Sequence, residues 1–172
     1  MTIITTKPGR VWTLGADVDT DQLAPGAYMK LSLEGIAPHC LEAVRPEFAT
    51  TVRPGDVIAA GPNFGIGSSR EQAAGALVHL GVQAVIAPSF GGLYFRNAFN
   101  LGLLLLTCAD AGLLKEGEPI TLGLEGRAPV VKRADGSSLA CEPIPGFLLE
   151  MVAAGGLLNQ LRQQYGKAPA SS

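Results

Sequence analysis

The sequence predicts an α/β domain built around a largely parallel β-sheet. Between residues 55 and 107, strand-like and helix-like segments alternate, and this order is typical of a parallel sheet with crossover helices. The strand-like runs are continuously apolar, as expected for strands that are covered on both faces. A chain of 172 residues has the length of one ordinary domain, so we expect residues 1–172 to form a single domain.

The elements up to residue 107 follow from apolar runs and from the positions of glycine and proline. Apolar runs closed by a turn residue predict strands, whereas apolar residues spaced three and four apart predict the helix that ends before Gly81. The expected elements are a strand at 10–14, a polar turn in the DVDTDQLAPG stretch, a helical segment around 33–44 broken by Pro38, a short piece after Pro46, strands at 55–61, 82–87 and 103–107, and helices at 69–80 and 91–100.

The pattern changes after Gly117, where the expected strands become short. PITLGL, APVVKR and SLACEPI read as strands, and the ADGS stretch between the last two is a hairpin-type turn. A final helix is expected from Phe147 to about Gln164, weakened by the Gly155-Gly156 pair.

Composition and charge exclude several classes of function. The net charge is −2 and there is no basic run, so the chain lacks the positive surface that nucleic-acid binding requires. The longest apolar stretch, LGLLLLTCA, is too short to cross a bilayer. The amino-terminal MTIITTKPGRVW has neither a secretory nor a transit pattern. We therefore expect a cytoplasmic protein that binds neither nucleic acid nor membrane.

The three cysteines are far apart in the sequence. Cys40, Cys108 and Cys141 form no Cys-x-x-Cys pair, which argues against a disulfide framework and against a self-contained metal or iron–sulfur site. Reduced, buried thiols in the cytoplasm are the expected state. We expect no metal ligands in this chain.

The GPNFGIGSSREQ stretch, residues 61–72, combines a flexible turn with polar side chains ahead of a helix. Ser68 and Glu71 have the spacing of a capping box. The glycines at 61, 65 and 67 permit positive φ angles and close approach of a ligand. A helix amino terminus attracts anions, and Arg70 adds a bidentate partner for a carboxylate or phosphate. These features predict an anion pocket.

The same residues also fit an ordinary capped helix after a glycine-rich turn, and physical reasoning alone leaves both interpretations open. Two nucleotide motifs are excluded. The stretch lacks the Gly-Lys-Ser/Thr of a phosphate-binding P-loop, and it lacks the Gly-x-Gly-x-x-Gly of dinucleotide-binding domains.

Four sequence blocks resemble a known family. DVDTDQ at 17–22, NFGIGSSRE at 63–71, GVQAVIAPSF at 81–90 and FRNAFNLGL at 95–103 are similar to the small subunits of 3-isopropylmalate dehydratase and its relatives, and they occur in the family's order. These subunits correspond to the swivelling carboxy-terminal domain of aconitase. The resemblance implies a three-layer β/β/α swivelling domain, which is compatible with the elements expected above.

The resemblance also implies a function and roles for individual residues. The family's hydro-lyases isomerise a hydroxy-di- or tricarboxylate by removing water and adding it back. A separate large subunit holds a [4Fe-4S] cluster, so this chain is expected to bind no cofactor itself. Ser68 matches the catalytic base, Arg70 and Ser69 match substrate-binding residues, and Asp21 matches an active-site aspartate that orients a group of the partner. The alternative for Asp21 is a solvated acidic turn.

The same resemblance places substrate selection in the loop at residues 26–35. Tyr28, Met29 and Leu31 would form a wall that accepts an alkyl group, whereas Lys30 either meets a distal carboxylate or is an exposed loop charge. The substrate is therefore open among isopropylmalate, homoaconitate-type and dimethylmalate-type acids. Isopropylmalate, in leucine biosynthesis, is the expectation because it is the commonest role of such separate subunits.

Three departures from the family pattern keep other functions open. Ile66 stands where many relatives have Cys or Glu, Gln72 where they have His, and Gly91-Gly92 where Ala-Arg is common. None of these is the presumed base, but polar and positive groups are missing near it. A carboxylate-binding module without catalysis and a regulatory subunit that has lost its chemistry are therefore the alternatives to a dehydratase subunit.

Overall fold

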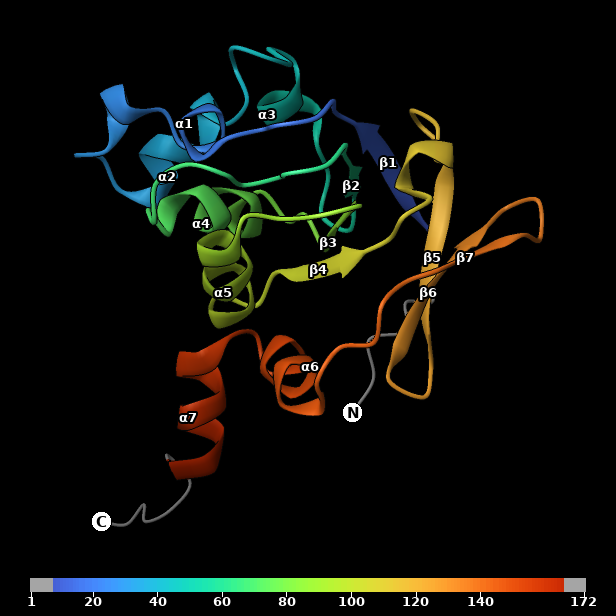
Figure 1. Cartoon of the computed structure of the whole chain (residues 1–172). Coiled ribbons are helices and arrows are strands. Elements are labelled where there is room, and N and C mark those ends of the chain that lie inside the picture. Colours follow the sequence, from blue (N-terminus) through green and yellow to red (C-terminus); the bar gives the residue numbers. More distant parts are fainter. Residues whose placement is uncertain (1–7, 166–172) are drawn as a thin grey trace.

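The computed structural model describes residues 8–165 (Figure 1). The amino-terminal residues 1–7, which carry much of the expectation about targeting, lie outside the described part. Four strands form the parallel half of the sheet in the order β4-β3-β2-β1. They are β1 (Gly9–Thr13), β2 (Val57–Ala59), β3 (Ala84–Ala87) and β4 (Leu104–Thr107). The parallel arrangement and the continuous burial of β2 and β3 are as expected.

The later strands extend the same sheet in an antiparallel manner. They are β5 (Pro119–Glu125), β6 (Ala128–Arg133) and β7 (Ser138–Ala140), and β5 pairs with the outer edge of β1. The order of the seven strands is therefore β4-β3-β2-β1-β5-β6-β7. Figure 1 shows that β5–β7 form a wing turned away from the parallel strands. The hairpin between β6 and β7 is confirmed by their antiparallel pairing.

The helices gather on the parallel half of the sheet and at its lower end. Figure 1 shows α4 and α5 together beside the parallel strands, with α1–α3 above them and α6 and α7 below. The helices are α1 (Thr20–Leu23), α2 (Leu33–Ile36), α3 (Phe48–Thr51), α4 (Gln72–His79), α5 (Gly92–Asn100), α6 (Gly146–Ala153) and α7 (Leu157–Tyr165). Short 3₁₀ turns occupy Gly26–Tyr28, Ala37–His39 and Ala111–Leu113. The α/β class is confirmed.

Several helices differ from the sequence prediction. The segment expected around 33–44 contracts to α2 and the 3₁₀ turn at Ala37–His39, and Cys40 is already extended. The stretch expected as a polar turn contains α1. The final helix is divided into α6 and α7, because Gly155 and Gly156 adopt φ angles of 86° and 113°, which no α-helix contains.

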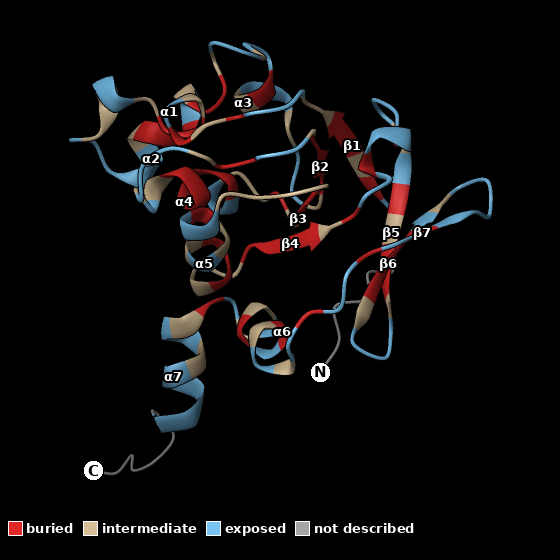
Figure 2. Cartoon of the chain, viewed as in Figure 1, coloured by how far each residue is buried: buried red, intermediate tan, exposed pale blue. Residues whose placement is uncertain are grey.

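The core lies between the parallel strands and the helices that cover them. Buried residues, red in Figure 2, are concentrated in β1–β4 and α4, whereas α7 carries no buried side chain. Trp12 of β1 packs edge-on against Phe48 of α3, with ring centroids 5.0 Å apart. No helix within residues 8–165 has the length and hydrophobicity needed to traverse a bilayer.

Candidate active site

The loops that follow β1 and β2 are adjacent because these strands are parallel neighbours, whose carboxyl ends meet at one edge of the sheet. Backbone hydrogen bonds continue the pairing beyond the strands. Gly65 N donates to Val18 O at 2.6 Å, and Thr20 N donates to Ile66 O at 2.8 Å. The DVDTDQ and NFGIGSSRE blocks, 46 residues apart, are thereby brought together, and Ser68 lies beside Thr20.

Ser68 presents an exposed hydroxyl that contacts two side chains. Its Oγ accepts a hydrogen bond from Arg70 Nε at 2.9 Å and lies 3.2 Å from Thr20 Oγ1. Its backbone N–H donates to the same Thr20 oxygen at 3.0 Å. The guanidinium predicted to accompany Ser68 is therefore in direct contact with its oxygen.

Arg70 is held in place from two sides. Its Nη1 donates to Ala24 O at 2.8 Å and to Asp21 Oδ1 at 3.3 Å. The same Asp21 oxygen accepts Gly26 N–H at 2.9 Å, so this carboxylate joins Arg70 to the start of the 26–35 loop. Within residues 8–165 no hydrogen bond occupies Arg70 Nη2, which leaves a donor that can bind an incoming carboxylate.

The capping box predicted for Ser68 and Glu71 is wrong. Helix α4 begins at Gln72, three residues later than expected, and Glu71 is its N-cap without a side-chain cap hydrogen bond. Ser68 lies outside the helix, and its hydroxyl is directed to Thr20 and Arg70. A capping box does occur at α1, where the Asp19 side chain accepts from Gln22 N at 2.8 Å and Asp19 N donates to the Gln22 side chain at 3.0 Å.

The turn still offers backbone donors next to Ser68. The N–H groups of residues 69–72 make no hydrogen bond to another atom of the described chain, whereas those of residues 73–75 are bonded to the carbonyls of Arg70 and Glu71. These donors precede α4 directly and add partial positive charge beside Arg70, whose own charge is paired with Asp21 at 3.3 Å. The anion pocket stays a prediction, and its backbone donors lie in the turn that precedes the helix, which begins at Gln72.

Glycines in the turn have distinct roles. Gly65 and Gly67 have φ angles of 83° and 116°, which confirms the expected left-handed conformation. A methyl at Gly65 would lie 2.6 Å from Tyr94 Cβ, and one at Gly67 would lie 2.7 Å from Thr20 Oγ1. Gly61 does not share the positive φ. Its missing side chain instead allows the backbone of Ala16 to approach, because a methyl there would lie 2.8 Å from Ala16 N.

The Gly91-Gly92 pair, one of the departures from the family pattern, is explained by packing at its first member. A methyl on Gly91, the N-cap of α5, would lie 2.8 Å from Gly65 O. Gly91 N also donates to Phe64 O at 2.9 Å, so the NFGIGSSRE turn rests directly on the start of α5. Gly92 has open space around it.

These two glycines give a matched pair of variants. Gly91→Ala is expected to displace the turn below Ser68 and to reduce kcat about 3- to 30-fold, with a loss of about 1–2 kcal/mol in the free energy of unfolding. Gly92→Ala should leave kcat unchanged, because nothing occupies the space of its methyl. Steady-state kinetics and urea unfolding of both variants test this; equal effects at both positions would contradict it.

Three residues of the site were missed by sequence reasoning. Thr20 contacts Ser68 through its side chain, and Asn97 Nδ2 donates to Ser69 O at 2.9 Å. The Tyr94 side chain packs directly against Gly65, and its hydroxyl donates to Ala73 O at 3.2 Å. Burial raises the pKa of the Tyr94 phenol, so this donor keeps its proton. The Ser69 side chain, predicted to bind substrate, is exposed next to Ser68.

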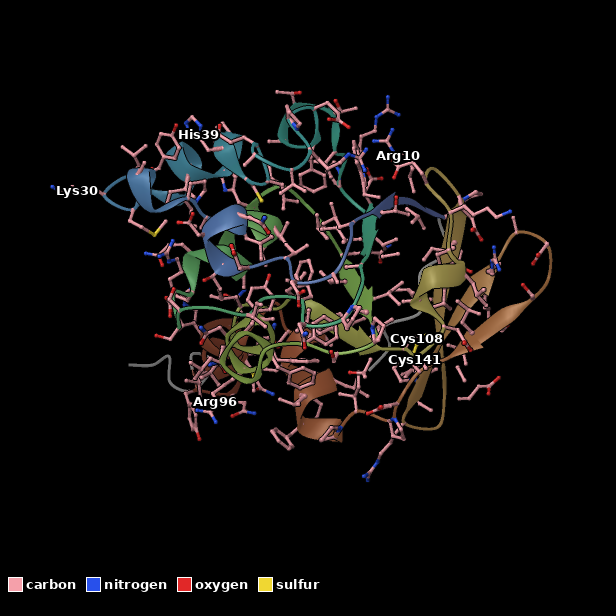
Figure 3. All side chains as sticks on the ribbon, turned by 45° about the horizontal axis from the view of Figure 1, so that its top comes forward. Arg10, Lys30, His39, Arg96, Cys108 and Cys141 are labelled. Carbon is pink, nitrogen blue, oxygen red and sulfur yellow. The ribbon has the colours of Figure 1, made fainter. Side chains whose placement is uncertain are left out.

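The 26–35 loop begins beside Arg70, but its side chains make contacts with other parts of the chain. Tyr28 stacks on His39 with ring centroids 3.6 Å apart, and Met29 packs partly against the core. Lys30 is exposed and points away from the molecule in Figure 3. A cavity of about 240 Å³ adjoins this loop and the start of α4; its lining residues are Leu31, Leu33, Glu71, Gln72, Gly75 and Leu101. Of the three residues predicted to form the alkyl-accepting wall, Leu31 lines this cavity, whereas Tyr28 and Met29 do not.

The cysteines are buried, and the three do not share one place in the fold. Figure 3 shows Cys108 and Cys141 together, and the Cys108 thiol donates to Ala140 O at 3.4 Å. Cys40 is in the core by itself, where burial raises its pKa to about 12. Within residues 8–165 no three His, Cys, Asp or Glu side chains are grouped so that they could bind a metal ion.

Comparisons with known proteins give matches over most of the chain. The aconitase C-terminal domain family matches residues 44–111. A methanogen homoaconitase small subunit from Methanothermobacter thermautotrophicus is 44% identical over 153 residues, which cover 88% of each chain. A 3-isopropylmalate dehydratase small subunit from Nautilia profundicola is 44% identical over 161 residues, covering 92% of this chain and 94% of its own.

A solved structure gives the same result for the fold. The crystal structure of 3-isopropylmalate dehydratase from Methanocaldococcus jannaschii superimposes with a TM-score of 0.86 and 36% sequence identity, and it covers the whole of both chains. The resemblance read from the four sequence blocks and the swivelling-domain fold that it implied are confirmed.

Proposed function

We propose a function from one premise: this chain belongs to the family of the 3-isopropylmalate dehydratase and homoaconitase small subunits. It is the small subunit of a hydro-lyase that isomerises 2-isopropylmalate to 3-isopropylmalate by dehydration and rehydration, in leucine biosynthesis. Its large subunit binds the substrate hydroxyl, and this chain contributes the base and a carboxylate-binding arginine. The reduced thiols fit a cytoplasmic enzyme.

The observation that carries this proposal is the contact between Ser68 Oγ and Arg70 Nε at 2.9 Å on an exposed surface. A serine hydroxyl titrates far above pH 7, so it acts as a base only where positive groups stabilise its alkoxide. Arg70 supplies a fixed positive charge to that oxygen, and the unbonded N–H groups of residues 69–72 add partial charges. Exposure leaves the oxygen open to a substrate held by another subunit.

Arg70 serves a second purpose in this proposal. While Nε contacts Ser68 and Nη1 is held by Ala24 and Asp21, Nη2 binds a substrate carboxylate. The carbon that loses its proton is next to a carboxylate, so one guanidinium aligns that carbon with Ser68. Asp21 fixes Arg70 and directs it at the substrate. Ser69, exposed beside Ser68, donates a second hydrogen bond to the substrate.

The iron–sulfur cluster belongs to the large subunit in this proposal. The cysteines of this chain are buried at two separate places, so they do not fit the three thiolates of a cluster. When bound to the partner, a [4Fe-4S] cluster provides the Lewis acid for departure of the substrate hydroxyl. Proton transfer at carbon falls to this chain.

A homoaconitase-type substrate is the second candidate. The relative from Methanothermobacter thermautotrophicus carries that name at 44% identity, and Lys30 is an exposed cation on the loop that is expected to select the substrate. Leu31 and Leu33 favour an alkyl group instead, because they form an apolar wall of the cavity next to α4, which Glu71 and Gln72 also line. A dimethylmalate-type acid would use the same apolar surface.

The test is reconstitution with the large subunit under anaerobic conditions. Neither chain alone should dehydrate 3-isopropylmalate, and the mixture should do so at a rate typical of enzymes, above about 1 s⁻¹. The kcat/KM for isopropylmalate, a homologous tricarboxylate and dimethylmalate then identifies the substrate. A stable complex without turnover of any of them would indicate a regulatory subunit. Tight binding of a dicarboxylate by the isolated chain, again without turnover in the complex, would indicate a binding module.

A further inference from the structure

Thr20 is a buried polar residue placed directly against the proposed base. It is 2% exposed, and of the described polar and charged residues only Asp56 is buried with it. Its Oγ1 accepts the backbone N–H of Ser68 at 3.0 Å and lies 3.2 Å from Ser68 Oγ. One threonine hydroxyl thus contacts both the backbone and the side chain of Ser68.

The protons of these groups can be assigned once Ser68 is deprotonated. An alkoxide can only accept hydrogen bonds, so the Thr20 hydroxyl must donate its single proton across the 3.2 Å contact. Thr20 Oγ1 simultaneously accepts Ser68 N–H, which polarises the Thr20 hydroxyl and strengthens its donation. Together with Arg70 Nε, the alkoxide then has two side-chain donors.

The position of Thr20 is fixed by its backbone and by Gly67. Thr20 N donates to Ile66 O at 2.8 Å, and Thr20 O accepts from Ala24 N at 2.9 Å. Gly67 has no side chain, and a methyl there would lie 2.7 Å from Thr20 Oγ1. The hydroxyl therefore occupies a space that the turn leaves open for it, and it is oriented before any substrate arrives.

We propose that Thr20 is a positioning residue that donates a hydrogen bond to the deprotonated Ser68 oxygen and thereby makes that oxygen available as a base. This inference rests on the proposed function, because it assumes that Ser68 removes a proton. Hydrogen bonds to charged oxygens have larger effects than those between neutral groups, and removing one donor from a catalytic oxyanion lowers kcat about 10- to 1,000-fold.

The test compares Thr20→Val with Thr20→Ser in the reconstituted enzyme. Valine keeps the shape of threonine but has no donor, so kcat should fall about 10- to 100-fold with little change in KM. Serine keeps the hydroxyl and should retain kcat to within about threefold. The alkaline rise of kcat should move to higher pH by about one unit or more in Thr20→Val, because a weaker donor set raises the pKa of Ser68. The exposed Thr50, replaced by valine, is the control.

Each outcome decides the proposal. Wild-type kcat and pH profile in Thr20→Val, or an equal loss in Thr20→Ser, would overturn it. If Ser68→Ala is inactive in the same assay, the proposed function survives that result; if Ser68→Ala is fully active, the proposed function fails as well. Should Thr20→Val not assemble, Thr20→Ala removes the same donor without filling the space, and its kcat and pH profile decide.

Discussion

Ser68→Ala is expected to lower kcat of the reconstituted dehydratase by at least about 10³-fold without weakening subunit assembly. Within residues 8–165 the variant removes the only oxygen that accepts a hydrogen bond from Arg70 Nε. The Thr20 hydroxyl is not a ready substitute, because it is buried and already accepts a hydrogen bond from the Ser68 backbone N–H. Losses of this size accompany removal of a catalytic base or of its stabilising charge. The side chain is exposed, so its loss should leave folding intact.

The neighbouring serine provides the comparison. Ser69→Ala removes a hydroxyl of the same kind one residue away, and it should reduce kcat/KM only about tenfold, as expected for one lost hydrogen bond to substrate. Assembly is measured by size-exclusion chromatography and activity by formation of the unsaturated product. A Ser68→Ala enzyme with at least a tenth of wild-type kcat would remove Ser68 from the mechanism.

Gly65→Ala should have the largest effect on stability of the substitutions at the site. Gly65 has a φ of 83°, and a methyl there would overlap the ring of the fully buried Tyr94. The left-handed conformation costs about 1 kcal/mol for alanine, and overpacking costs about 1–3 kcal/mol more. We expect a loss of about 3 kcal/mol and a fall in Tm on the order of 10 °C.

Gly126→Ala separates the two causes. Gly126 has a φ of 67°, but its methyl would meet no neighbouring atom, so this variant reports the conformational cost alone. It should lose only about 1 kcal/mol. Thermal unfolding of both variants measures the difference. Equal destabilisation would mean that Tyr94 does not support the turn, and the explanation given for Gly65 would then be wrong.

The strands of the parallel half could be predicted from sequence, whereas the beginning of α4 could not. Strands such as VIA at 57–59 are buried on both faces, so they appear in the sequence as continuous apolar runs that predict a strand directly. The start of α4 depends on what Ser68 contacts. A serine followed three residues later by Glu71 has the spacing of a capping box. In the structure the Ser68 hydroxyl contacts Thr20 and Arg70 instead, so it does not cap α4.

The residues of the site were easier to predict than their assembly. The family resemblance indicated Ser68, Arg70 and Asp21, and the structure brings these three together. Thr20 was missed because a threonine in a polar stretch has no distinctive signal until its spatial neighbour is known. The neighbour is 48 residues away, across the β1–β2 pairing. The same kind of distant pairing, β5 on β1, determines the order of the sheet.

The 26–35 loop, which is predicted to select the substrate, shows the limits of assignment by position. Of the residues predicted to form an alkyl-accepting wall, Tyr28 stacks on His39, whereas Leu31 lines the cavity beside α4 together with Leu33. A loop of this kind is shaped by contacts that come from elsewhere in the chain. Its sequence therefore gives the chemical types that are available but not which of them point toward the substrate.

The measurement that tests the central claim most directly is exchange of the substrate's carbon-bound hydrogen. Isopropylmalate labelled with deuterium at the carbon that loses its proton is incubated with the reconstituted enzyme, and release of the label into water is followed. The wild-type enzyme should release it during turnover, and Ser68→Ala should release it at least about 10³-fold more slowly while binding the substrate with a similar Kd. Release at the wild-type rate by Ser68→Ala would show that another group removes the proton.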